Sequence, residues 1–158
     1  MIRRAAFSRC GRYRYALWRE WDASRPTVLF VALNPSTADH RRDDPTIRRC
    51  IGFSREWGFG ALVVANLFAF RTPYPNLLRA ERDPVGPRND RWIRRLVYEA
   101  GLVVAAWGAN GDYLRRASHI ADRLGDCHAL GVTRSGAPRH PLYVRADVQP
   151  QPFSLAPR

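Results

Sequence analysis

Four apolar runs without alternation divide the chain, and each has the length of a strand. They cover residues 27–33, 61–67, 102–107 and 127–132. An unbroken apolar run of this length predicts a strand that is buried on both faces, as in a parallel sheet. Helical spacing of apolar residues between the runs predicts a helix that begins at Pro45 with Asp44 as its N-cap, and two more over 90–100 and 112–124.

The remaining segments are less regular. Aromatic residues over 13–18 predict an antiparallel edge strand, and residues 68–89, with four prolines, predict a long functional loop. A proline-rich tail from 149 to 158 is expected to be loosely held. The alternation of strands and helices predicts an α/β fold, a three-layer α/β/α sandwich with a central, mainly parallel four-stranded sheet, in a single domain over 1–148.

The polar residues that follow these strands indicate where a site would lie. Right-handed crossovers place the carboxyl ends of parallel strands at one edge of the sheet, and ligands bind beyond those ends. The first strand runs into Asn34, the second into Asn66 and the third into Gly108, and we expect His140 to approach them. The sequence therefore predicts one site at this edge.

Eight residues are candidates for that site, in two groups. The catalytic candidates are Asn34, Asp39 and His140. The candidates for binding substrate or phosphate are Ser36, Thr37, Asn66, Arg71 and Gly108.

Each candidate also has a structural interpretation. Asn34 could orient a water molecule or bind the edge of a base, or it could cap the turn before Pro35. The hydroxyl groups of Ser36 and Thr37 could cradle a phosphate or only complete that turn. Arg71 could bind a phosphate through two nitrogens or be an ordinary surface arginine.

The acidic and basic candidates raise similar alternatives. Asp39 could activate water, and together with Asp43 and Asp44 it could hold a divalent cation, although Asp44 is better explained as an N-cap. His140, in a segment that is rich in glycine and proline, could stabilise developing charge or bind phosphate, but a lone histidine is more often structural.

Composition and motifs argue against several classes of protein. A hydrophobic content of 46% in 158 residues is typical of a globular domain, and no apolar run approaches the roughly 20 residues that span a bilayer. The first residues lack the apolar core of a signal peptide, so we expect a cytoplasmic protein without a membrane partner. The three cysteines form no Cys-x-x-Cys pair, which argues against zinc, and we expect no metal or cofactor. The motifs of P-loop nucleotidases and of Gly-x-Ser-x-Gly hydrolases are missing.

The net charge of +12 favours an anionic partner, either a nucleic acid or a nucleotide. All 26 basic residues are arginine, so the charge also reflects an arginine-rich composition.

Several motifs together resemble a small bacterial and phage family, domain of unknown function 1643. They are Tyr13-Arg14-Tyr15-Ala16-Leu17, Leu33-Asn34-Pro35-Ser36-Thr37-Ala38-Asp39, Asp44-Pro45-Thr46, Asn66-Leu67-Phe68, Asp83-Pro84-Val85-Gly86, Asn89-Asp90, Trp107-Gly108 and His140-Pro141-Leu142-Tyr143. More distantly, Ala32-Leu33-Asn34-Pro35-Ser36 is similar to the first motif of the uracil-DNA glycosylase superfamily, which reads Gly-Ile-Asn-Pro-Gly in the mismatch-specific branch.

This second resemblance implies an α/β/α fold and hydrolysis of an N-glycosidic bond. Asn34 would position the attacking water, and the stretch from Asn66 that includes Arg71 is similar to the Thr-Asn…Arg-Thr segment of the superfamily. His140-Pro141-Leu142 is similar to the start of its His-Pro-Ser motif, whose histidine stabilises the departing base. Ser36 replaces the glycine of the first motif. The alternatives are a non-catalytic nucleotide- or DNA-binding module and a metal-assisted phosphoester hydrolase that uses Asp39 and Asp44.

Overall fold

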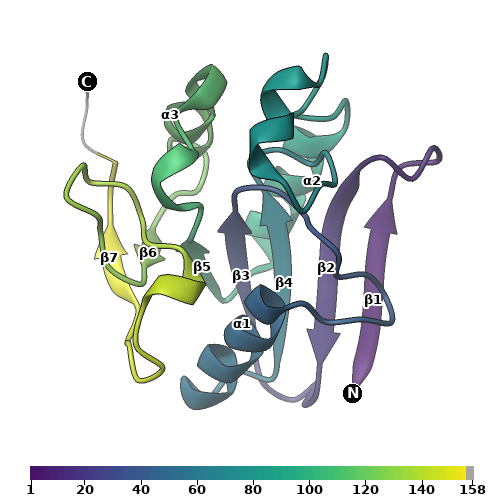
Figure 1. The fold of residues 1–158 in the computed structure, drawn as a ribbon. Coiled ribbons are helices and arrows are strands. Elements are labelled where there is room, and N and C mark those ends of the chain that lie inside the picture. Colours follow the sequence, from purple (N-terminus) through teal and green to yellow (C-terminus); the bar gives the residue numbers. More distant parts are fainter. Residues whose placement is uncertain (156–158) are drawn as a thin grey trace.

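The computed structural model describes residues 1–155, which form a mixed α/β fold around a seven-stranded sheet. The strands are β1 (Ile2–Phe7), β2 (Arg14–Glu20), β3 (Thr27–Ala32), β4 (Ala61–Asn66), β5 (Leu102–Ala105), β6 (Cys127–Ala129) and β7 (Gln151–Phe153). Their order across the sheet is β1-β2-β4-β3-β5-β6-β7, which Figure 1 shows from the N-terminal edge to the opposite edge.

The four predicted apolar runs form the parallel centre of this sheet. β3 pairs in parallel with both β4 and β5, and β5 pairs in parallel with β6. Every residue of β4 is buried, and so are five of the six in β3. Unbroken apolar runs form such strands because both faces are covered.

Helices cover both faces of the sheet. Helix α1 (Pro45–Glu56) packs Ile47 and Phe53 against Phe30 of β3 on one face. On the other face, α2 (Asn89–Glu99) and α3 (Arg116–Ala121) pack Ile93 and Ile120 against the same strands. Asp44 caps α1 as predicted: its Oδ1 accepts a hydrogen bond from the Ile47 amide at 2.9 Å.

Two predictions about the sheet are wrong. The strand predicted over 13–18 is not at the edge, because β1 pairs antiparallel with one side of β2 while β4 pairs with the other. The sheet also exceeds four strands, since β1, β2 and β7 extend the parallel centre. β7 pairs antiparallel with β6, within the segment that was expected to be a loose tail, whose residues 156–158 lie outside the described residues.

The helix predicted over 112–124 is interrupted. Leu114 and Arg115 adopt left-handed backbone conformations with φ of 54°, which α-helices do not contain. They are the last two residues of a short 3₁₀ turn, η3 (Tyr113–Arg115), and α3 begins directly after them at Arg116. Three further 3₁₀ turns are η1 (Pro75–Ala80) in the long loop, η2 (Gly108–Asn110) and η4 (Pro141–Tyr143). None of the helices within 1–155 combines the length and apolar character needed to cross a membrane.

Candidate functional site

A cavity of about 600 Å³ lies at the carboxyl ends of β3, β4 and β5. β4 and β5 flank β3 on opposite sides, so the chain direction across the sheet reverses here. Open α/β sheets bind ligands at such a switch point. Residues after the three strands line the cavity, and Arg14 of β2, the start of α1 and the segment around η4 complete its wall. Five of the eight predicted residues line it: Asn34, Ser36, Asn66, Gly108 and His140.

The side-chain amide of Asn34 has a fixed orientation. Its Nδ2 donates to the main-chain oxygens of Pro35 at 3.0 Å and Thr72 at 2.9 Å. Both N–H groups are therefore used by the protein. The Oδ1 atom forms no hydrogen bond with the described residues, so it is the atom of this amide that remains available, as an acceptor.

Asn66 lies at the end of β4 and is 1% exposed. Its Oδ1 is buried and has no hydrogen-bond partner among the described residues. A buried acceptor without a partner costs free energy, so Asn66 is a strained polar group at the end of β4.

His140 and Gly108 form one side of the cavity together. Gly108 has a φ of +75°, which favours glycine, and a Cβ at this position would lie 3.5 Å from the Cβ of His140. The Nδ1 of His140 accepts a hydrogen bond from the Leu142 amide at 3.2 Å and so caps η4. Burial lowers the pKa of His140, against an opposing effect of Asp44. The imidazole is therefore neutral, with its proton on Nε2.

Ser36 and Thr37 differ in position. Ser36 is half-buried in the cavity lining, whereas Thr37 is exposed and lies outside it. Neither hydroxyl group forms a hydrogen bond with another residue in the range 1–155, which leaves the Ser36 hydroxyl available to a ligand.

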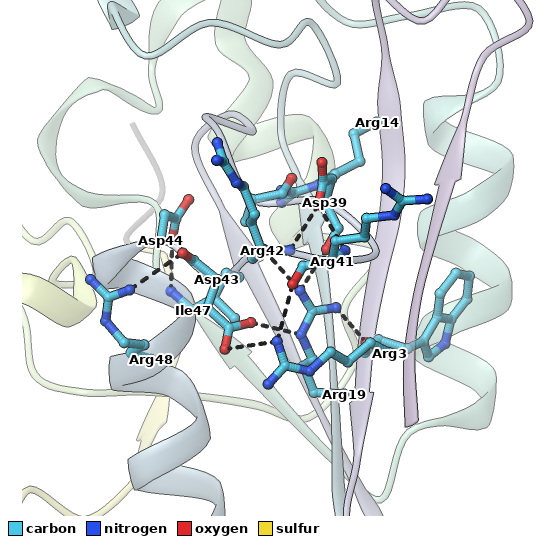
Figure 2. Close-up of polar contacts among 12 residues, drawn as sticks. Arg3, Arg14, Arg19, Asp39, Arg41, Arg42, Asp43, Asp44, Ile47 and Arg48 are labelled. Carbon is cyan, nitrogen blue, oxygen red and sulfur yellow. Dashed lines mark hydrogen bonds and ion pairs between the residues drawn. The ribbon is translucent and has the colours of Figure 1, made fainter. Parts of the chain in front are cut away.

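Asp39 lies outside the cavity lining and holds a turn (Figure 2). Its Oδ1 accepts hydrogen bonds from the main-chain amides of Arg41 at 2.7 Å and Arg42 at 2.8 Å. These two bonds hold the pKa of Asp39 below its usual value. The arrangement explains the carboxylate as a cap for the loop between β3 and α1.

Arg71 also lies outside the cavity lining. Its guanidinium lies over the ring of Phe7, 4.6 Å from the ring centroid, and its Nε is buried without a partner among residues 1–155.

A buried arginine fixes the loop that leads from the cavity to α1. Arg19 of β2 is fully buried, and its Nε pairs with Oδ1 of Asp43 at 2.8 Å. It also donates to the main-chain oxygens of Trp18, Asp39 and Arg42. Figure 2 shows Arg3 of β1 and Arg19 of β2 reaching the carboxylate of Asp43. The network holds residues 39–44 against the sheet.

Arg14 is a cavity residue that the sequence interpretation missed. It is 2% exposed and lines the cavity from β2. In the pairing of β1 with β2, Ala6 opposes Ala16 and Phe7 opposes Arg14, so Tyr15 has no partner and forms a bulge. A bulge changes the face to which the preceding side chain points. An arginine within an aromatic, strand-like run was the available signal.

The carboxylates near the cavity do not form a metal site. Among the described residues, no group of three His, Cys, Asp or Glu side chains could hold a metal ion. Asp44 lines the cavity, but its Oδ1 caps α1.

Comparison with known proteins identifies a family. The sequence model of a protein family, described as "Protein of unknown function (DUF1643)", matches residues 14–142. No curated protein and no solved structure matches the chain.

Proposed function

This chain belongs to the DUF1643 family, and we propose that it binds a nucleobase, carried by a nucleotide or a nucleic acid, in the cavity at the carboxyl edge of its sheet. We further propose that it hydrolyses the N-glycosidic bond of that ligand. The observation that carries the proposal is the pair of opposite polar groups in one cavity. Asn34 presents only an acceptor and His140 presents an Nε2–H donor.

A nucleobase matches this pair chemically. The edges of bases place N–H donors beside carbonyl or ring-nitrogen acceptors. Trp107 provides apolar surface on the cavity wall. A volume of about 600 Å³ is in the usual range for cavities that hold small ligands.

The same groups supply the chemistry of glycosidic hydrolysis. Oδ1 of Asn34 would accept a hydrogen bond from a water molecule and hold it for attack on C1′ of the sugar. As the C1′–N bond breaks, its electron pair moves onto the base, and Nε2–H of His140 would stabilise the resulting negative charge. Water adds its hydroxyl to the sugar and its proton reaches the departing base through solvent.

The resemblance of Ala32-Leu33-Asn34-Pro35-Ser36 and His140-Pro141-Leu142 to uracil-DNA glycosylase motifs supports the proposal. The arrangement of helices on both faces of a parallel centre is compatible with the three-layer α/β/α fold of that superfamily. The net charge of +12 is favourable for a phosphate-bearing ligand.

A non-catalytic binding module is the second candidate, and Ser36 favours it. Its side chain stands in the cavity lining where the glycosylase motif has glycine, which narrows the approach of a base to Asn34. The metal-assisted phosphoester hydrolase has less support, because Asp39 and Asp44 each bind backbone amides.

The test is release of free base from oligonucleotides and mononucleotides that carry uracil, mismatched thymine, hypoxanthine or other modified bases. Wild type is compared with Asn34→Ala and His140→Asn, and with Asn76→Ala as a control on the exposed face of η1. The substitution His140→Asn keeps an acceptor near the Leu142 amide but removes the Nε2 donor.

Three outcomes separate the candidates. Base release that is lost in both site variants and kept in Asn76→Ala supports the enzyme. Binding of nucleotides without release identifies the binding module. Neither binding nor release contradicts the proposal as a whole.

A further inference from the structure

Three arginines are buried in the described part of the chain, and two of them are paired with carboxylates. Arg14, Arg19 and Arg116 are 2%, 0% and 5% exposed. Arg19 pairs with Asp43 at 2.8 Å and Arg116 pairs with Asp90 at 2.7 Å. Arg14 forms no ion pair with any residue in 1–155. A buried charge without a counter-ion is unfavourable, so Arg14 requires an explanation that the other two do not.

The guanidinium of Arg14 has one edge without a protein partner. Its Nη1 donates to the main-chain oxygen of Ala38 at 2.9 Å. Its Nε is buried without a partner, and Nη2 forms no hydrogen bond within the described residues. The Nε–Nη2 edge is the one that binds two oxygens of a phosphate or carboxylate side by side.

The charges around Arg14 do not neutralise it. Asp44 is the carboxylate with the greatest effect, but it caps α1 and forms no ion pair with Arg14 among the described residues. Arg71 and Arg19 add positive charge nearby. Burial lowers the pKa of Arg14 to about 10, which leaves it cationic at neutral pH.

The free edge belongs to a residue of the cavity wall. Arg14, Ser36 and Arg139 all line the cavity that contains Asn34 and His140. The hydroxyl of Ser36 also has no hydrogen-bond partner among residues 1–155. The wall thus contains a cation and a hydroxyl group that can both bind an anionic oxygen.

We propose that Arg14, helped by the hydroxyl group of Ser36, binds a phosphate group of the ligand. The inference rests on the proposed function, because it assigns the phosphate to the same molecule that carries the nucleobase. A ligand that carries this phosphate group is a nucleotide or a nucleic acid, and not a free base or a nucleoside. A mononucleotide phosphate and the phosphodiester of a single strand have the same chemistry, and the experiment separates them.

The experiment measures affinity by calorimetry for matched probes: nucleosides, the corresponding 5′-monophosphates, a short single-stranded oligonucleotide and inorganic phosphate. We expect wild type to bind the monophosphate at least about 10-fold more tightly than the nucleoside. In Arg14→Gln that preference should fall below about twofold, while nucleoside affinity is retained. Arg91→Gln, an exposed arginine of α2, removes the same charge and should leave the preference unchanged.

The outcomes distinguish the two proposals. Equal wild-type affinity for nucleoside and monophosphate overturns the role of Arg14 and leaves base binding intact. Binding of inorganic phosphate that depends on Arg14, without binding of any nucleoside or nucleotide, supports the anion site and contradicts the proposed function. A preference that survives in Arg14→Gln also overturns the inference. An oligonucleotide that binds more tightly than the monophosphate, with the same dependence on Arg14, identifies the phosphodiester as the source.

A second measurement applies if Arg14→Gln does not fold. The Nε–H group of Arg14 is buried, so it can serve as an NMR probe in ¹⁵N-labelled wild type. Its resonance would be assigned through its contacts with neighbouring residues. Titration with a 5′-monophosphate should shift this resonance, whereas the nucleoside should leave it in place. An Arg14 resonance that does not move at saturating monophosphate overturns the inference.

Discussion

The side-chain amide of Asn34 donates to the main-chain oxygen of Thr72 at 2.9 Å and so joins the loops that follow β3 and β4. The bond links residues that are 38 positions apart, and a second bond from the same nitrogen reaches Pro35. Together they fix which atom of Asn34 faces the cavity. The polarity of the site therefore depends on the contact between these two loops.

Replacing Asn34 with aspartate should destabilise the protein. The substitution removes both donors and places a carboxylate oxygen against two carbonyl oxygens. We expect a loss of about 1–3 kcal/mol in the free energy of unfolding, measured by urea denaturation at neutral pH. Asn76→Asp, on the exposed face of η1, is the matched control and should change stability by less than about 0.5 kcal/mol. Equal effects at the two positions would contradict the assigned hydrogen bonds.

Removing the carboxylate that pairs with Arg19 should lower the free energy of unfolding more than the substitution at Asn34 does. Asp43→Asn leaves the fully buried guanidinium of Arg19 without its carboxylate. We expect a loss of about 3 kcal/mol, because an unpaired buried charge is strongly unfavourable. Asp147→Asn removes the partner of Arg145 in a highly exposed pair and should change stability by less than about 0.5 kcal/mol. Denaturant unfolding of both variants tests the difference, and a loss no larger at Asp43 than at Asp147 would disprove it.

Asp39→Asn separates a structural carboxylate from a catalytic one. Asparagine keeps an oxygen that can accept from the amides of Arg41 and Arg42, so the turn should survive with a loss below about 1 kcal/mol. We expect ligand affinity and base release to be retained. If Asp39 activates water, as the sequence interpretation allowed, base release should instead fall by about 100-fold or more. Assays of release by the folded variant decide between these roles.

The parallel centre of the fold could be predicted because its signals are local. An apolar run needs no knowledge of its partner to be recognised as a buried strand, and Asp44 followed by Pro45 marks a helix start within a few residues. The strand ends follow from the same pattern. That is why Asn34, Asn66 and Gly108 could be placed at one edge of the sheet before the structure was known.

The outer strands and the bulge depend on contacts between distant segments. The pairing of β1 with β2 and of β7 with β6 is not visible in the residues of β1 and β7 themselves, which form no unbroken apolar run. The bulge at Tyr15 exists only in the register between β1 and β2, and it determines which face Arg14 occupies. A sequence pattern alone does not reveal a register shift, so the buried arginine of the cavity was missed.

Strand β7 should matter for the cavity through an aromatic contact. The ring of Phe153 meets that of Trp107 edge-on, with centroids 6.3 Å apart, and Trp107 lines the cavity. Phe153→Ala should destabilise the protein by about 1–3 kcal/mol and weaken ligand binding, because Trp107 loses its support. Phe153→Leu, which keeps apolar volume, should have the smaller effect. Denaturation and calorimetry test both variants, and unchanged ligand affinity in Phe153→Ala would separate β7 from the site.

His140 should make stability depend on pH with a defined sign. Burial lowers its pKa below 6.5 in the folded protein, whereas Asp44 opposes the shift. Between the lowered pKa and about 6.5, the unfolded chain binds more protons than the folded one, so the free energy of unfolding rises with pH. The stability that the neutral, buried His140 provides is therefore fully present above about pH 6.5. It is lost as the pH falls through the lowered pKa.

The variant His140→Asn isolates this effect. It removes the titrating ring and keeps a side-chain oxygen near the Leu142 amide. Denaturation from about pH 5 to about pH 8 should show a smaller slope for the variant than for wild type. In wild type, an NMR titration of His140 should report a pKa below 6.5. A titration at or above that value would contradict the effect of burial on the pKa of His140.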